Sequence, residues 1–396
     1  MKNTNYFKIA STVVVHVSRL VIGAVFVFSG FVKAIDPLGY TYKIEEYLSA
    51  FGGFFANFTP LAFTAAIALS AIELLIGLNL LFSVRLKETS IVALLFMLFY
   101  TPLTFYIWLT DPVTDCGCFG DALIISNGAT FAKNLILLVL AIALLACLKG
   151  KKSFWQPRVE WAMVLIFIGL GFGLQIYSYC HLPMIDFRPY KIGTYIPEKM
   201  EYPENAPNDV YEMLFIYKNN ETGKQRDFKL QGTKMIDVKD KTEYEFSEFA
   251  ENWTFVDQNT KLIKKGYTPP IHDFTITDED GYDITYDVLG YEGYSYFLVM
   301  YDLKKTSIKG AQIAEKIYQK YKDTNVKFYA LTAVNDDEIE MFKEKAGVSF
   351  PFYKTDATQL KTMIRANPGL ILIKNGTVEG MWNWRNLGDL RFKLIL

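Results

Sequence analysis

The two halves of the chain differ in how their apolar residues are spaced. Before about residue 182 these residues form long, nearly uninterrupted runs, whereas Lys, Glu, Asp and Tyr are mixed evenly after it. Each run has about the 20 residues that cross a hydrocarbon core, and the runs cover about residues 13–35, 60–82, 89–109, 129–148 and 159–179. The pattern predicts an α-helical membrane bundle followed by a water-soluble part.

Basic residues in the short loops predict the orientation of these spans. Lys2 and Lys8 precede the first span, and the other basic loops hold Arg85, Lys87, Lys149, Lys151, Lys152 and Arg158. Because such loops stay on the cytoplasmic side, the loop 110–128 and everything after Cys180 are expected outside. For a bacterial inner membrane that side is the periplasm, where disulfides persist.

The first section of the soluble part shows the pattern of a β-hairpin. Short β-type runs at 213–217 and 226–230 are separated by turn residues at 219–223. Pro269-Pro270 then marks a boundary. We therefore expect a small β-rich domain at residues 183–268, after a four-span bundle at 1–150 and a fifth span at 151–182.

The last section, residues 269–396, alternates strand and helix patterns and is expected to be an α/β domain. Strands are predicted at about 296–301, 326–331, 369–373 and 377–381. Helices are predicted at about 310–321, 336–346 and 360–365. Asn367-Pro368 stands directly before the third of these strands.

The net charge and the cysteine count give no support to two classes of protein, nucleic-acid-binding proteins and disulfide-rich scaffolds. The formal net charge is -1, which gives no argument for binding nucleic acid. The chain has 4 cysteines, too few for a disulfide scaffold, and none follows Cys180. The soluble part therefore has no thiol chemistry of its own.

Cys116 and Cys118, separated by Gly117 in the loop between the third and fourth spans, are the main candidates for chemistry. An exposed thiol pair in an oxidising compartment can exchange electrons or disulfides with a partner, and a bridge closed within Cys-x-Cys would be strained and labile. The alternatives are a plain bridge from one of them to Cys180, or a tight turn that happens to contain cysteines.

Cys180 lies at the outer end of the fifth span and is followed by His181. It is a candidate resolving thiol for the Cys116–Cys118 pair, or a small packing residue at a helix end. A copper or zinc site from Cys116, Cys118, Cys180 and His181 is a further alternative, although the spacing is unlike that of zinc sites. Cys147 lies at the inner side, where packing explains it.

Arg19 and Glu73 lie within apolar spans, where ionised groups are costly and usually paired. We expect an Arg19–Glu73 salt bridge, which either fixes the bundle or forms part of a polar pocket for a quinone or substrate. Lys33, with Asp36 and Tyr40, lies where the first span emerges and is expected to line an outer pocket near the Cys-x-Cys loop, or to reach the interface as a snorkelling residue.

The run Cys116-Gly117-Cys118-Phe119-Gly120-Asp121 resembles DoxX-like membrane proteins of the MauE type. The segments Ser29-Gly30-Phe31-Val32-Lys33 and Asp36-Pro37-Leu38-Gly39 support the resemblance. It implies a four-helix bundle, similar to that of vitamin K epoxide reductase relatives. It also implies a role in disulfide formation during maturation of periplasmic enzymes, with quinone as the cofactor of quinone-coupled relatives.

The order of elements after residue 269, with Pro368 entering a strand before a hairpin, resembles the thioredoxin fold. The resemblance implies a cis proline, a conformation that X-Pro bonds adopt at modest energy. That family's Cys-x-x-Cys would fall near Asp302–Ser307, where there is no cysteine. A membrane bundle followed by a thioredoxin-like section resembles DoxX proteins of Bacteroidetes.

Two functions fit these sequence features. The first is an inner-membrane thiol–disulfide oxidoreductase or its accessory subunit, with Cys116, Cys118 and Cys180 in the exchange and a periplasmic or membrane protein as partner. The second is a non-enzymatic scaffold of a periplasmic complex, in which the cysteines are structural. A transporter would need an inverted repeat, which the sequence does not show.

Overall fold

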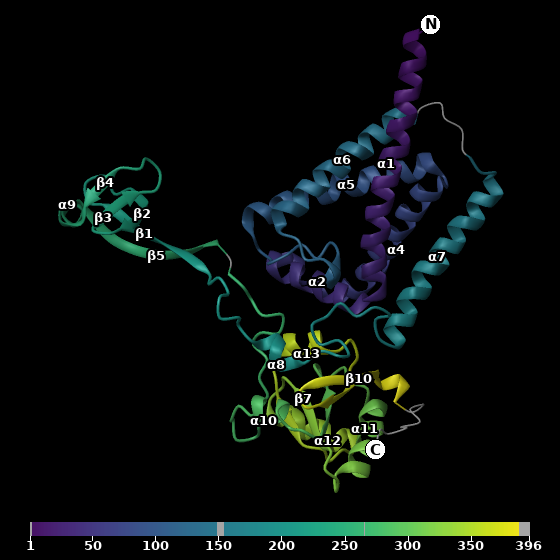
Figure 1. Cartoon of the computed structure of the whole chain (residues 1–396). Helices are drawn as coiled ribbons and strands as arrows, with labels where there is room; N and C mark the ends of the chain where they lie inside the picture. Colours follow the sequence, from purple (N-terminus) through teal and green to yellow (C-terminus); the bar gives the residue numbers. More distant parts are fainter. Residues whose placement is uncertain (1, 149–153, 265, 388–396) are drawn as a thin grey trace. The chain divides into compact units, whose positions relative to one another are not determined.

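The chain divides into two compact units in a computed structural model that describes residues 2–148, 154–264 and 266–387. One unit comprises Met1–Ile196 with Asp273–Leu396, and the other comprises Pro197–His272. All of the long helices lie in the first unit (Figure 1).

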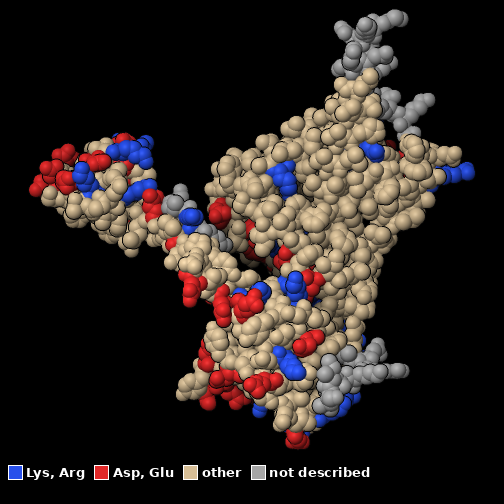
Figure 2. Space-filling model, in the orientation of Figure 1, with Lys and Arg blue, Asp and Glu red and all other residues tan. Residues whose placement is uncertain are grey.

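Among the residues that the structure describes, five long apolar helices form the amino-terminal part of the first unit, as the sequence predicts. They are α1 (Lys2–Ile35), α4 (Ala62–Phe82), α5 (Leu86–Thr110), α6 (Asn127–Cys147) and α7 (Pro157–Cys180). Each is long enough to cross a membrane. On the face drawn in Figure 2, charged side chains are sparse over these helices, as lipid contact requires.

The burial pattern of the helices is that of a membrane protein. Large apolar side chains such as Leu95 and Phe99 are exposed on the outside of α5, whereas Thr101 and Thr104 are buried against α6. The buried Asn134 donates from Nδ2 to Thr104 Oγ1 at 3.2 Å. This polar pair is therefore satisfied inside the bundle, while the exposed apolar surface suits contact with lipid.

The two ends of the bundle are built differently. Short helices cover one end: α2 (Pro37–Phe51), α3 (Gly53–Ala56), η1 (Thr59–Leu61) and η2 (Gly120–Ala122). Cys147 lies at the opposite end, where Ser11 Oγ donates to its carbonyl oxygen at 3.2 Å. Three of the basic residues used to predict orientation, Lys149, Lys151 and Lys152, lie outside the described residues.

Up to residue 387, where the described residues end, the carboxyl-terminal part of the first unit is a mixed five-stranded sheet with helices. The strands are β6 (Tyr294–Val299), β7 (Lys327–Thr332), β8 (Phe352–Lys354), β9 (Gly369–Lys374) and β10 (Thr377–Asn383). Their order is β10-β9-β6-β7-β8, with β6, β7 and β8 parallel and β9 and β10 antiparallel to their neighbours. The helices are α10 (Thr285–Leu289), α11 (Ile308–Tyr321), α12 (Asp336–Ala346), α13 (Ala357–Met363) and η3 (Trp384–Asn386).

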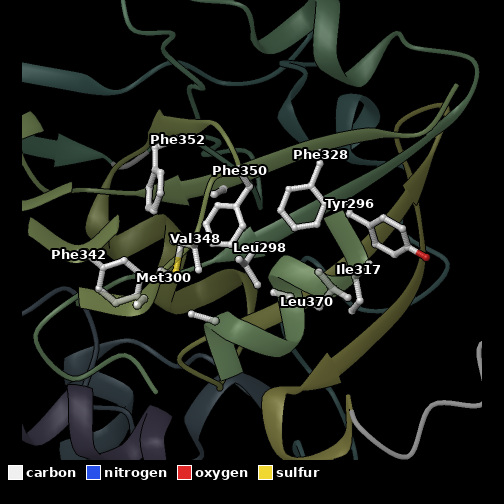
Figure 3. Packing of buried hydrophobic residues seen from close by; sticks show 14 of the residues in the cluster. Tyr296, Leu298, Met300, Ile317, Phe328, Phe342, Val348, Phe350, Phe352 and Leu370 are labelled. Atoms are coloured by element: carbon white, nitrogen blue, oxygen red, sulfur yellow. The ribbon is translucent and has the colours of Figure 1, made fainter. Parts of the chain in front are cut away.

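This arrangement confirms the alternation of strands and helices predicted from the sequence, and the Asn367-Pro368 peptide is cis. Leu298, Phe328, Phe350 and Ile317 of α11 belong to one cluster of buried side chains, in which Met300 lies beside Phe342 and Val348 (Figure 3). The apolar spacing that predicts α11 therefore also supplies the core of the sheet.

The second unit is an antiparallel sheet of five strands in the order β4-β3-β2-β1-β5. Its elements are β1 (Val210–Asn219), β2 (Gln225–Gln231), β3 (Lys234–Asp237), β4 (Glu243–Glu245), α9 (Phe246–Asn252) and β5 (Trp253–Lys264), after α8 (Ile196–Met200). The predicted hairpin is the β1–β2 pair. The small core of the second unit consists of Phe228, Met235, Phe249 and Trp253.

Candidate functional site

The Cys-x-Cys loop is held against the end of the bundle by hydrogen bonds from the helices α6 and α2. Asn127 Nδ2, at the start of α6, donates to Asp111 Oδ1 at 2.7 Å and to the carbonyl oxygen of Val113 at 2.9 Å. Tyr47 of α2 donates from its hydroxyl to the carbonyl oxygen of Cys116 at 2.6 Å. The loop is thus a fixed structure and not a free connection.

The turn around Gly117 brings the two cysteine side chains together. Gly117 has φ +60°, and its N–H donates to Asp115 Oδ1 at 2.8 Å. The Cys116 and Cys118 Sγ atoms lie 3.0 Å apart. This separation is longer than the roughly 2.05 Å of a disulfide, so the side chains are two thiol groups that share a hydrogen bond.

The two thiols differ in acidity because one stabilises the other. The hydrogen bond from Cys116, followed by the ammonium groups of Lys133 and Lys33, lowers the pKa of Cys118 from 9.0 to about 6, although burial acts in the opposite direction. The same bond and burial raise the pKa of Cys116. The two thiols titrate as a pair, and the first proton is lost from Cys118. The resulting Cys118 thiolate is the form that attacks disulfides.

Beneath Cys118 lies a buried ion pair between α1 and α4. Lys33 Nζ is 2.7 Å from Glu73 Oε1 and 2.8 Å from Oε2, and both side chains are almost fully buried. Ser29 Oγ is 2.7 Å from Glu73 Oε2 and also 2.7 Å from the carbonyl oxygen of Cys118, and its single hydrogen can serve one of them at a time. The serine links the ion pair to the loop.

The expected Arg19–Glu73 salt bridge is wrong. Arg19 donates to the carbonyl oxygens of Leu80 and Leu81 and to Ser83 Oγ. Because α1 and α4 run antiparallel, Arg19 faces residues 80–83, about two turns beyond Glu73. Glu73 instead faces Lys33. Charge alone suggested the pairing, whereas helix register decides it.

A cavity of about 40 Å³ separates Cys118 from the ion pair, and its lining includes Ser29, Lys33, Glu73 and Lys133. This volume holds one or a few water molecules, far less than the roughly 300 Å³ of small ligand sites. A quinone ring does not fit there. Quinone binding by Lys33, Glu73 and Arg19 stays a prediction, and Lys33 also lines the larger cleft described next.

A larger cleft of about 500 Å³ opens on the other side of the loop. Lys33, Asp36 and Tyr40 line it, as the sequence led us to expect. The remaining lining comes from α1, α2, the loop, the segment 183–188 that follows α7, and the carboxyl-terminal part. Its charged members include Lys43, Glu46, Asp115, Asp121, Arg188, Lys361 and Arg365. Charged side chains share this lining with apolar ones, which include Val32, Ile124 and Phe187. The cleft is therefore large enough for a ligand or a segment of a partner polypeptide.

Arg365 connects the carboxyl-terminal part to the end of the bundle. Its Nε lies 2.9 and 3.0 Å from the two carboxylate oxygens of Asp36, and its Nη2 lies 3.2 Å from Asp121 Oδ2. Arg365 is buried, and the two carboxylates raise its pKa against the effect of burial, which is the largest influence. The cleft wall beside the Cys-x-Cys loop is therefore closed by an ion-pair network.

The structure brings Cys116, Cys118, Lys33 and Glu73 together, but not the other two candidates. Within the described ranges no hydrogen bond joins Cys180 to either cysteine of the loop. His181 stacks on Tyr177, with ring centroids 4.5 Å apart. The resolving role of Cys180 stays a prediction. Among the same residues, no group of three or more His, Cys, Asp or Glu side chains is arranged to hold a metal ion.

Lys133 is the main residue that the sequence reading missed. It lies in the second turn of α6, inside the predicted span 129–148. A charged residue within an apolar span was the signal that singled out Arg19 and Glu73, and the same signal would have found Lys133. Arg365 and Tyr47 gave no comparable signal, because both lie in ordinary polar surroundings in the sequence.

Comparison with known proteins places this site in a family domain. Residues 11–147 match the family model described as methylamine utilisation protein MauE. The matched segment contains the loop, the buried ion pair and Lys133. It does not include α7 or the sheets.

No curated protein matches the chain. Among solved structures, the chain is similar to the solution structure of a candidate protein disulfide isomerase from Bacteroides thetaiotaomicron. The identity is 18% and the TM-score is 0.26, and the match covers 31% of this chain and 86% of that chain.

Proposed function

We propose that this chain is a multi-pass membrane protein that exchanges disulfides with a partner protein, or an accessory subunit of such a system, through Cys116 and Cys118. The observation that carries the proposal is the thiol pair itself, with Sγ atoms 3.0 Å apart and a low pKa at Cys118. The matched MauE segment and the adjacent cleft of about 500 Å³ support it.

The proposed step balances as a two-electron exchange. The Cys118 thiolate attacks one sulfur of the partner's disulfide, whose other sulfur leaves as a thiolate. Cys116 passes its proton to that thiolate and attacks the mixed disulfide, forming the Cys116–Cys118 bond and releasing the partner's second sulfur as a thiolate. The partner gains two electrons and the loop loses two; the reverse sequence oxidises a partner dithiol.

The remaining parts of the chain are proposed to present the partner. The carboxyl-terminal sheet, in a thioredoxin-like arrangement without Cys-x-x-Cys, would contact the partner protein without chemistry of its own. The loop and both sheets would lie in the periplasm of an inner membrane. The domain division would be the one predicted from the sequence, at 1–150, 151–182, 183–268 and 269–396.

The test is disulfide exchange by the full-length protein in lipid nanodiscs. A model peptide with one disulfide would report its own reduction as the reduced protein is added. We expect Cys116→Ser and Cys118→Ser each to lower the rate at least 100-fold. Cys147→Ser, at the opposite end of the bundle, should match the wild type.

A rate that Cys118→Ser leaves unchanged would reject the proposal. The effect of Cys180→Ser is informative in its own right. Loss of the second step, with accumulation of a mixed disulfide, would give Cys180 the resolving role, whereas an unchanged rate would leave that role to Cys116.

The scaffold alternative has one observation in its favour. Arg365, bound to Asp36 and Asp121, fixes the carboxyl-terminal part beside the loop, as an assembly subunit would require. A scaffold predicts that the serine variants retain all partner binding and that the wild-type protein shows no exchange.

A further inference from the structure

Lys133 extends from α6 toward the Cys-x-Cys loop. Its Nζ lies 4.4 Å from the centroid of the Phe119 ring, and Phe119 follows Cys118 in the chain. Lys133 and Cys118 line the same cavity of about 40 Å³. The ammonium group therefore lies over the residue that follows Cys118 and shares a small cavity with Cys118, inside a span where few groups can neutralise it.

The charges around this cavity are unbalanced. Its lining contains two positive side chains, Lys33 and Lys133, and one negative side chain, Glu73. Lys33 and Glu73 bind each other at 2.7 Å. Within the part of the chain that the structure describes, no carboxylate lies within ion-pairing distance of Lys133. The cavity therefore has one uncompensated positive charge, which one thiolate would neutralise.

The other titratable groups near Cys118 do not supply that negative charge. Asp115, in the loop, is 3.2 Å from Lys43 of α2. Tyr40 and Tyr47 of α2 and Tyr100 of α5 are phenols, which are neutral near pH 7, and the Cys116 thiol keeps its proton. Across α1, α2, α4, α5 and α6, the Cys118 sulfur is the group left to pair with Lys133.

We propose that Lys133 is a positioning residue that stabilises the thiolate of Cys118 and so prepares the loop for attack on a disulfide. The inference rests on the proposed function. Lys33 contributes little net charge because Glu73 neutralises it, and Ser29 fixes the Cys118 backbone. A lysine that merely covers Phe119 with its alkyl chain and reaches toward water would have no effect on the acidity of Cys118.

The test measures how the alkylation rate of Cys118 depends on pH. Full-length protein in nanodiscs would be treated with iodoacetamide between pH 4 and 9, with fragment-ion mass spectrometry separating Cys118 from Cys116. The wild-type midpoint is expected near pH 6. Lys133→Gln should raise the midpoint by at least about one unit, as expected for loss of a nearby opposite charge. The alkylation rate at pH 6 would then fall about fivefold.

Matched variants keep the test specific. Lys133→Arg should restore the wild-type midpoint, and Arg19→Gln, which removes an intramembrane cation in the middle of α1, should not change it. A Lys133→Gln midpoint equal to the wild type would overturn the inference, and so would a wild-type midpoint near the ordinary cysteine value.

Exchange with the model peptide at pH 8.5 separates this inference from the proposed function. At that pH, Cys118 of the Lys133→Gln variant is again a thiolate, so the variant should exchange at nearly the wild-type rate. A wild-type protein that does not exchange at any pH would reject the proposed function, whatever the alkylation profile shows. An unshifted profile in a wild-type protein that does exchange would reject only the role of Lys133.

Discussion

Gly117 is the residue on which the shape of the Cys-x-Cys loop depends. Its φ of +60° lies in the left-handed region, which costs other residues about 1 kcal/mol or more. A Cβ atom built there would lie 2.7 Å from Cγ of Lys43. The glycine thus permits both the turn that pairs the two sulfurs and the close approach of Lys43, which binds Asp115.

Replacing Gly117 by Ala should therefore separate the thiols without removing either of them. We expect a loss of about 1–2 kcal/mol in stability. The alkylation midpoint of Cys118 should move upward as the Cys116 hydrogen bond is lost. Thermal denaturation in detergent and the pH profile would measure the two effects. Gly169→Ala, on an open face of α7 where a Cβ meets nothing within 4 Å, is the control; a normal midpoint in Gly117→Ala would contradict the account.

At the scale of single residues, the reactive and charged residues of the site could be predicted from the sequence, whereas their contact partners could not. Cys116 and Cys118 stand out by spacing, and Glu73 and Lys33 by charge in or beside an apolar span. Their partners were not predictable from charge, because pairing across helices depends on register. Arg19 was assigned to Glu73 for that reason, and the structure pairs it with the 80–83 segment instead.

The packing of α1 against α4 is the element-scale feature that creates the site. Gly30 of α1 and Gly77 of α4 let the two backbones approach. A Cβ atom at Gly30 would lie 2.4 Å from the Leu74 nitrogen, and one at Gly77 would lie 2.5 Å from the Val27 nitrogen. This close contact, typical of small residues between membrane helices, sets the register that places Lys33 opposite Glu73.

Breaking the Lys33–Glu73 pair should strongly destabilise the bundle. Glu73→Ala leaves a buried, unpaired ammonium group, a change that costs roughly 3–5 kcal/mol. The double variant Lys33→Met/Glu73→Leu should recover most of the stability because no charge remains buried. Thermal denaturation in detergent measures both.

The exposed pair Arg85–Glu88 offers a matched comparison, since Glu88→Ala should cost less than about 1 kcal/mol. Equal effects of Glu73→Ala and Glu88→Ala would show that the buried pair does not hold the helices.

At the scale of the first unit, helix and strand positions were largely readable from the sequence. Apolar run length gave five spans, and alternating patterns gave the strands and helices after residue 290, because both depend on local periodicity. The contact between the carboxyl-terminal part and the loop was not readable. Arg365 lies 329 residues from Asp36, and nothing local in the sequence marks that pairing.

Removing Arg365 should open the cleft. Arg365→Ala leaves Asp36 and Asp121 without their shared cation. We expect a several-fold increase in the rate at which a bulky maleimide modifies Cys116, relative to a small one. Lys345→Ala, an exposed position on α12, should leave that ratio unchanged. A ratio that also stays unchanged in Arg365→Ala would show that the ion pairs do not restrict access.

The central claim is that Cys116 and Cys118 form a reversible redox pair. The most direct measurement is thiol trapping of the full-length protein in native membranes equilibrated across a series of thiol–disulfide buffers. We expect both cysteines to be trapped or protected together. The ratio of reduced to oxidised protein should change tenfold for about every 30 mV of buffer potential, as in a two-electron transition. Cys116 and Cys118 that remain thiols, or remain bridged, over the whole series would contradict the account.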